Sequence, residues 1–208
     1  MKLVAVITLY FLYSCSENKT IQKCPVGSFK SDIPAAFGDS GFVQRKQKLL
    51  KSVGLAPLTQ GFSQMQVRIW YGYPYSDRDN LLLFSKTADK WKGEIWEIKY
   101  WSKIFDGKDS VFADKRNVTP RCGWNLFMDS LINHGLLTLK DCSNIPGYSC
   151  EDAGNNIIVE FASCDAYRIY HLSEPSLRAA KFEEAKSVTE ISTIIERQLS
   201  FRRLFIEK

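Results

Sequence analysis

The chain has 208 residues, of which 45% are hydrophobic and 25% are charged, and its formal net charge is +5 at pH 7. This length and apolar content are enough to bury one good core, so we expect a single folded domain. The mildly basic charge is no nucleic-acid signature, and no repeat or low-complexity tract is present, so we expect no nucleic-acid partner.

Residues 1–14 have the pattern of a secretory signal peptide. After Lys2, the eleven residues from Leu3 to Tyr13 carry no charge. At about 1.5 Å per residue, this run is too short to cross a bilayer core of roughly 30 Å. An apolar run of this length is typical of a signal that is removed on export.

The apolar run ends in Leu12-Tyr13-Ser14-Cys15. This stretch resembles the lipobox of bacterial lipoproteins, in which a Leu, a small residue and then Cys mark the cleavage and lipidation site. Tyr13 departs from the pattern, because the family favours a small or aliphatic residue there. The resemblance implies that Cys15 is the first mature residue and the lipid attachment point. The alternative is an ordinary signal peptide on a secreted protein, with Cys15 a bystander.

The residues after Cys15 are polar, beginning Ser16-Glu17. This start resembles lipoproteins that Bacteroidetes-like bacteria send to the outer membrane or the cell surface, and it implies a lipid-anchored protein of the outer membrane. Residues 15–40 are rich in Ser, Lys, Pro and Gly without periodicity, and we interpret them as a tether. Residues 41–208 then form the α+β domain, which opens with a short basic amphipathic helix over Phe42–Val53.

Three strands joined by short loops are predicted in the middle of the chain. Alternating or continuous apolar residues mark Val67–Tyr73, Leu81–Ser85 and Lys92–Trp101. Short connections make such strands antiparallel neighbours. The tetrapeptide Thr87-Ala88-Asp89-Lys90 has the length of a hairpin loop.

The alternation also predicts which aromatic side chains lie in the core. One face receives Tyr71, Trp96 and Tyr100, and the opposite face receives Trp70 and Trp101 together with charged residues. An exposed aromatic platform would bind sugars or protein partners. Its candidate residues are Trp70, Tyr73, Tyr75 and Trp101. The alternative is that a helix or the N-terminal arm covers this face.

The second half of the chain predicts two further strands and two helices. The strands are Ile157–Phe161 and Tyr167–His171, and the helices lie near Trp124–Asn133 and Val188–Phe201, the second opened by a capping box at Ser187–Glu190. The Thr119-Pro120 pair predicts the start of the first helix, and Gly135 its end. The whole predicts an α+β fold, with an antiparallel sheet of about five strands packed by two or three helices.

Apart from Cys15 there are five cysteines, and an exported chain meets an oxidising compartment. Four of these cysteines alone allow three connectivities, and Cys142 with Cys150 is the simplest pair because a short turn-rich loop joins them. No CxxC occurs and no His stands at ligand spacing. We therefore expect no zinc or other metal site and no cofactor.

No motif in the sequence specifies a chemistry. The segment Gly38-Asp39-Ser40-Gly41 is not a protease nucleophile segment, because both histidines come later in the chain. The leading hypothesis is a non-enzymatic, membrane-tethered module that binds an envelope protein or glycan. The second is a hydrolase of the cell envelope with an acid/base pair drawn from Asp77, Asp79, Glu97 and Glu151.

Overall fold

The computed structural model describes residues 29–35, 49–72, 78–102, 109–150 and 155–201. Among these residues the strands form one sheet of seven, in the order β1-β7-β6-β2-β3-β4-β5. The strands are β1 (Lys30–Asp32), β2 (Met65–Gly72), β3 (Arg78–Thr87), β4 (Lys90–Ser102), β5 (Asp109–Val118), β6 (Asn156–Ser163) and β7 (Ala166–Ser173). The helices are α3 (Trp124–Asn133), α4 (Pro175–Arg178) and α5 (Glu183–Leu199), with a 3-10 turn η1 (Cys142–Asn144) and a helical segment at 49–52.

The sheet is mixed, because β1 pairs in parallel with β7 while the other neighbouring strands are antiparallel. The prediction of an antiparallel sheet of about five strands is therefore wrong. The two additional strands lie at the two edges, where neighbours on only one side impose little apolar pattern. β5 is rich in charged residues, and β1 has three residues within the stretch that the sequence predicts as a tether.

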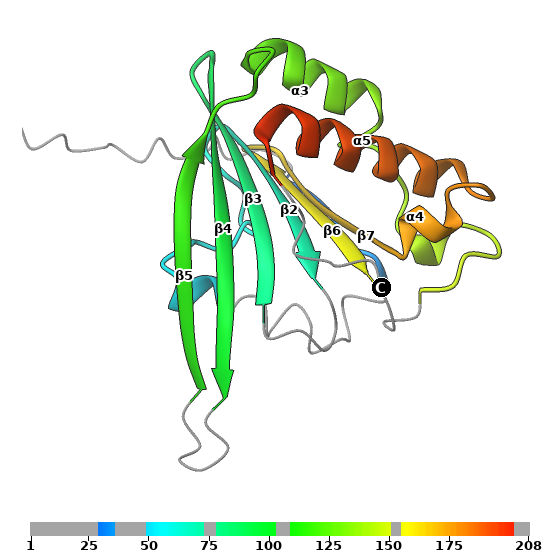
Figure 1. The fold of residues 1–208 in the computed structure, drawn as a ribbon, viewed down its shortest axis with the longest axis horizontal. Coiled ribbons are helices and arrows are strands. Elements are labelled where there is room, and N and C mark those ends of the chain that lie inside the picture. The colour runs from blue at the N-terminus through cyan, green and yellow to red at the C-terminus, as the bar shows by residue number, and fades with distance from the viewer. Residues whose placement is uncertain (1–28, 36–48, 73–77, 103–108, 151–154, 202–208) are drawn as a thin grey trace, which may run out of the picture.

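One face of the sheet packs against α3 and α5, as Figure 1 shows. We call this packing the helix-side core. Its centre combines strand residues such as Ile69 and Leu82 with the buried stripe of α3, Phe127, Met128 and Leu131. Helix α5 adds a second stripe, which consists of Ala185, Val188, Ile191, Ile195 and Leu199. Spacing of three and four residues places each stripe on one side of its helix.

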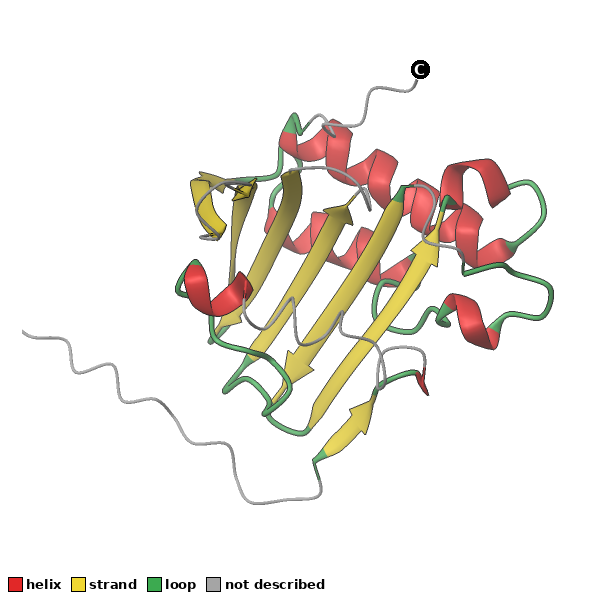
Figure 2. Ribbon diagram, turned by 90° about the horizontal axis from the view of Figure 1, so that it is seen from below, coloured by secondary structure: helices red, strands yellow, loops and turns green. Residues whose placement is uncertain are grey.

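The opposite face is covered as well. The helical segment at 49–52 and the loop that follows it lie over part of this face in Figure 2, on the side away from α3 and α5. Leu49, Leu50 and Leu58 are buried there against Trp70, Leu81 and Trp96, which come from the neighbouring strands β2, β3 and β4. We call this packing the loop-side core. The sheet is thus buried on both faces, which explains why its central strands carry apolar residues in nearly every position.

The predicted alignment of the faces is wrong at β4. Trp96 lies opposite Leu81, which lies opposite Trp70, so Trp96 belongs to the loop-side core and not to the face of Tyr71. The cause is the β3–β4 turn. Thr87 pairs with Lys90, so only Ala88 and Asp89 lie between the strands, and Ala88 has a positive φ of 51°. A sequence pattern does not fix such a register, and a shift by one residue exchanges the faces of a strand.

The bounds of α3 are those predicted, but its N-cap differs, and α5 starts earlier than predicted. Helix α3 starts at Trp124 with Gly123 as its N-cap, so Pro120 precedes a separate turn. Helix α5 starts at Glu183, and Ser187 lies inside it instead of capping it. Acidic residues in the first turn, Glu183 and Glu184, interact favourably with the positive end of the helix dipole. Gly135, with a φ of 87°, ends α3 as expected.

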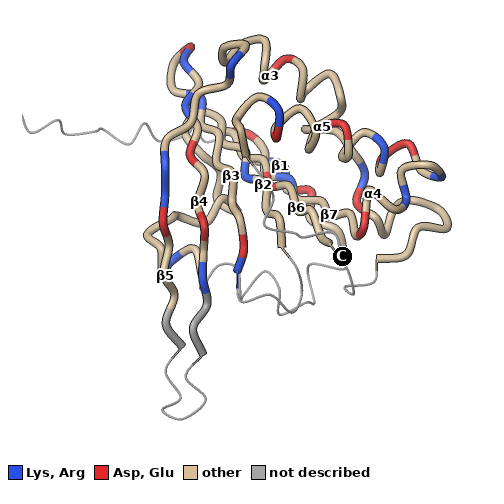
Figure 3. The backbone as a smooth tube through the Cα atoms, in the orientation of Figure 1, with Lys and Arg blue, Asp and Glu red and all other residues tan. Residues whose placement is uncertain are grey.

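Charged residues of both signs are intermixed over the outer strands and helices (Figure 3). Along β5, for example, Asp114 is followed directly by Lys115 and Arg116. The described surface therefore shows no extended field of one sign, in agreement with the small net charge.

Candidate functional site

Trp70, the first of the four candidate platform residues, is not on the surface. Its side chain is 1% exposed, because the segment that carries Leu49, Leu50 and Leu58 covers it. The prediction that this face meets water is wrong at Trp70, and the alternative of a covered face is confirmed there. Tyr73 and Tyr75 lie outside the described residues. Trp101 belongs to β4, but its side chain also lies outside what the structure describes.

A polar network is buried beside Trp70. The indole Nε1–H of Trp70 donates to Glu160 at 2.8 Å, and the hydroxyl of Tyr167 donates to the other carboxylate oxygen at 3.1 Å. Burial and the neighbouring negative charge of Glu160 raise the pKa of Tyr167, so this hydroxyl stays protonated and remains a donor.

Arg68 lies opposite Glu160 in the register of β2 and β6 and is 1% exposed. Its guanidinium donates to Gln66 at 2.9 Å and to the carbonyl of Ala56 at 2.7 Å, while Nη1 has no hydrogen-bond partner among the described residues. Desolvation lowers the pKa of Arg68, and the charge of Glu160 opposes that shift. The network fixes the covering segment to the sheet through Ala56. We interpret it as structural, because its charged groups have almost no exposed surface.

The carboxylates of the hydrolase hypothesis are not brought together where the structure describes them. Asp79 lies opposite Ile98, on the loop-side face, whereas Glu97 lies opposite Asn80, on the helix-side face. These two therefore cannot act on one substrate as an acid/base pair. Asp77 and Glu151 lie outside the described residues.

A second cluster joins η1 to β7, and sequence reasoning missed it. The strand β1 pairs with β7 only as far as Arg168, so among the described residues no strand pairs with this edge of β7 beyond that point. Asp141, the N-cap of η1, closes this edge because its Oδ2 accepts the backbone N–H of His171 at 2.8 Å. Its Oδ1 accepts from the backbone N–H and hydroxyl of Ser143, at 3.0 Å and 2.6 Å.

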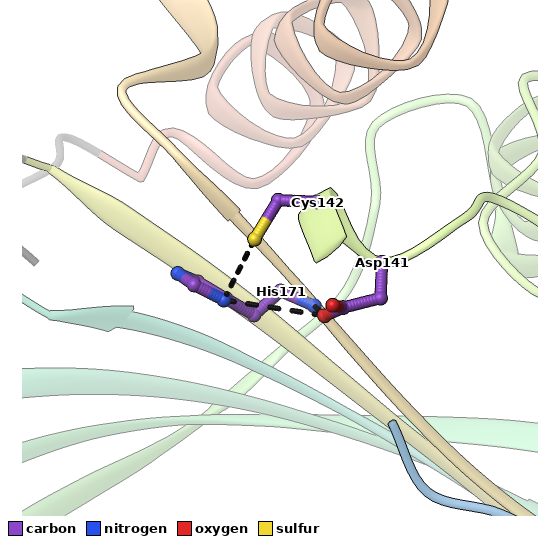
Figure 4. A group of neighbouring side chains, drawn as sticks. All are labelled: Asp141, Cys142 and His171. Carbon is purple, nitrogen blue, oxygen red and sulfur yellow. Dashed lines mark hydrogen bonds and ion pairs between the residues drawn. The ribbon is translucent and has the colours of Figure 1, made fainter. Parts of the chain in front are cut away.

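His171 and Cys142 meet above this carboxylate, as Figure 4 shows. The Nδ1 of His171 lies 3.3 Å from Sγ of Cys142 and 4.0 Å from Oδ2 of Asp141. All three residues are buried. Cys142 is bonded to Cys150, which confirms the simplest predicted disulfide. The sequence separation of 29 between Cys142 and His171 explains why spacing rules did not find the cluster.

The cluster is not a nucleophilic triad. In a triad the base contacts the nucleophile through one ring nitrogen and the orienting carboxylate through the other. Here the same Nδ1 faces both partners, and the sulfur is in a disulfide. The disulfide likewise removes Cys142 from the set of metal ligands, since metals bind cysteine as thiolate. In this state the three residues are a buried structural junction.

The remaining cysteines and histidine have simpler environments. Cys122 is exposed and is not part of a disulfide, and Cys164 donates to the carbonyl of Ser63 at 3.2 Å. His134 follows α3 and contacts the carbonyl of Ser130 through Nδ1 at 2.7 Å. This agrees with its interpretation as a residue at the C-terminal end of the helix. Cys15, the predicted lipid attachment point, lies outside the described residues.

β5 is one of the two edge strands of the sheet. It pairs with β4 on one side and, within the described ranges, with no strand on the other. Val111 and Ala113 pack against the loop-side core, while the side chain of Phe112 is 61% exposed. Such an edge presents backbone donors and acceptors that an added strand can pair with.

No family model, curated protein or solved structure matches this chain. None of the helices in the described ranges combines the length and the apolar character needed to cross a bilayer.

Proposed function

We propose that the chain is a lipid-anchored protein of the bacterial cell envelope, most suited to the outer membrane, whose folded domain binds another envelope protein without catalysis. The observation that carries the anchor is the sequence Leu12-Tyr13-Ser14-Cys15 directly after the uncharged run. Lipidated at Cys15, the chain would be held at a membrane by acyl chains, each buried CH₂ contributing about 0.8 kcal/mol.

The disulfide supports export. Buried disulfides persist in oxidising compartments and are rare in a reducing cytosol. The bond between Cys142 and Cys150 closes a loop of turn-rich sequence against β7. An ordinary secreted protein would share this feature. The disulfide therefore supports export to an oxidising compartment, while only Cys15 supports a lipid anchor.

The tether is shorter than residues 15–40. Because β1 starts at Lys30 and pairs with β7, the polar stretch that separates a lipidated Cys15 from the sheet is residues 16–29. Fully extended at roughly 3.4 Å per residue, fourteen residues reach at most about 48 Å. This length allows the domain to contact a partner in or near the same membrane.

The edge strand favours a protein partner over a glycan. The open side of β5 offers main-chain hydrogen bonds to an extended segment, and Phe112 offers apolar contact beside it. Sugars are bound mainly on exposed aromatic rings, and burial removes Trp70 from such a platform. Charged residues along β5, Asp114, Lys115 and Arg116, disfavour indiscriminate pairing of this edge.

Affinity capture from the native envelope tests this function. The wild-type protein is compared with Phe112→Asp and with the matched control Leu177→Asp, which changes an equally apolar and 77% exposed residue on α4. We expect a defined partner to be retained by the wild type and the control and to be lost with Phe112→Asp. Equal retention by all three proteins, or no retained partner, would contradict binding at β5.

A further inference from the structure

The junction between η1 and β7 brings four groups together that share an affinity for thiophilic metal ions. Asp141, Cys142 and His171 each offer one ligand atom, and these atoms all lie within 4.8 Å of one another. Cys150 is the disulfide partner of Cys142, so its sulfur lies one bond away from that of Cys142. A disulfide needs neither a histidine nor a carboxylate beside it. The disulfide therefore does not explain why His171 and Asp141 lie next to Cys142.

We propose that the reduced chain binds one thiophilic divalent cation, for which zinc is the representative, through Cys142, Cys150, His171 and Asp141. The disulfide form and the metal-bound form exclude each other, because the same two sulfur atoms make either the S–S bond or the metal bonds. The site is independent of the lipid anchor and of partner binding at β5.

The distances suit a tetrahedral site. With Zn–N bonds of about 2.0–2.1 Å and Zn–S bonds of about 2.3 Å, neighbouring ligand atoms of a tetrahedron lie roughly 3.3–3.8 Å apart. The separation of 3.3 Å between Cys142 Sγ and His171 Nδ1 falls within this range, and the 4.0 Å between His171 Nδ1 and Asp141 Oδ2 needs a small inward movement. Figure 4 shows Nδ1 of His171 between the sulfur of Cys142 and the carboxylate of Asp141.

The surroundings would hold the ligands in place. Asp141 is 2% exposed, Cys142 is 0% exposed and His171 is 8% exposed, so water competes little for the metal. Asp141 already accepts hydrogen bonds from Ser143 and from the backbone of His171, and these fix the carboxylate as outer-shell partners do in metal sites. A divalent ion bound by two thiolates, one carboxylate and a neutral imidazole forms a site with a net charge of −1.

Conversion between the two forms requires a reductant, and we name a small dithiol as its chemical class. One thiolate of the dithiol attacks Cys150, which is only partly buried, and Cys142 leaves as a thiolate beside His171. The second thiol of the reductant then displaces Cys150 and closes a new disulfide, so one S–S bond forms for the one that breaks. The metal ion takes up the two cysteine sulfurs as thiolates and releases their two protons.

The test compares the oxidised protein with the dithiol-reduced protein, freed of reductant, in titrations with Co²⁺ and then Zn²⁺. We expect the reduced protein to bind one equivalent, with the thiolate-to-cobalt absorption of a tetrahedral site, and the oxidised protein to bind none. Zinc should also slow alkylation of Cys142 and Cys150, because their sulfurs are then bound to the metal, while alkylation of the exposed Cys122 stays unchanged. Alkylation mapped by mass spectrometry needs no variant, so it does not depend on how substitutions fold.

Matched variants complete the test. The chain has two histidines. We expect His171→Ala to weaken binding far more than His134→Ala, and Asp141→Asn to weaken it because an amide is a poorer ligand than a carboxylate. If reduction unfolds the protein, zinc should restore its circular dichroism, since metal binding then contributes folding free energy. A reduced protein that neither binds nor refolds with zinc, or equal effects of the two histidine substitutions, would overturn the proposal.

Discussion

Trp70 and Glu160, on the neighbouring strands β2 and β6, are joined by a buried hydrogen bond of 2.8 Å between the indole Nε1–H and Oε2. The bond gives the carboxylate a partner inside the protein, and Tyr167 supplies another. A face that carries Glu160 and Arg68 can therefore be core. Buried polar groups are tolerated where they are hydrogen-bonded.

Both central tryptophans should consequently be essential for stability. We expect Trp70→Ala and Trp96→Ala each to lower the free energy of unfolding by about 3–5 kcal/mol, because both side chains fill the loop-side core. Trp70→Phe should cost about 1–3 kcal/mol, since it leaves a buried carboxylate oxygen without its donor. Chemical denaturation measures all three. A nearly neutral Trp70→Ala would show that residues 49–62 do not cover this face.

The sequence predicted the strands whose neighbours lie on both sides and missed those at the edges. β2, β3, β4, β6 and β7 each contain a predicted strand, because burial on both faces leaves an apolar signal. β5 and β1 are strands because of the backbone hydrogen bonds that β4 and β7 offer them, and such bonds leave no mark on side-chain periodicity. The same limit applies to the cluster of Asp141, Cys142 and His171, whose members meet only through the fold.

Trp124, the first residue of helix α3, packs against the sheet at Gly93, which has no side chain. A Cβ built on Gly93 would collide with the indole of Trp124 and would lie 3.1 Å from Cδ1 of Phe84. We expect Gly93→Ala to destabilise the protein by about 1–3 kcal/mol. Gly93→Ala should lower the free energy of unfolding less in a Trp124→Ala background than in the wild type. A double-mutant cycle measures this difference. Additive effects would mean that the indole does not occupy this space.

Alkaline pH should destabilise the protein in part through Tyr148. Its hydroxyl donates to the carbonyl of Ser173 at 2.7 Å, and burial raises its pKa to about 12, against a lowering effect of Arg178. The contribution of Tyr148 is complete below pH 10, the usual tyrosine value, and is lost as pH rises to about 12, because the unfolded chain ionises first. Between these values the wild type should lose more stability than Tyr148→Phe. If the wild type and Tyr148→Phe lost the same stability over this pH range, the raised pKa of Tyr148 would be refuted.

The disulfide should stabilise the oxidised protein by a measurable amount. Cys142 and Cys150 are 8 residues apart, and closing such a loop in the unfolded chain contributes roughly 2.5 kcal/mol by the chain-entropy relation. We expect the double variant Cys142→Ser/Cys150→Ser to lose about this much in non-reducing denaturation. Cys122→Ser, at an exposed position, serves as the control and should be unchanged. Equal stability of the double variant and the wild type would argue against the bond.

The most direct test of the proposed function is the membrane association of Cys15→Ala in the native host, with Cys24→Ala as the matched control. The lipid anchor predicts that the wild type and Cys24→Ala sediment with membranes and carry acyl chains on the N-terminal residue Cys15. Cys15→Ala should instead appear in the soluble fraction, because removal of the acyl chains removes the anchoring free energy. Retention of Cys15→Ala on membranes at the wild-type level, or a wild-type protein without acyl chains in the soluble fraction, would contradict the account.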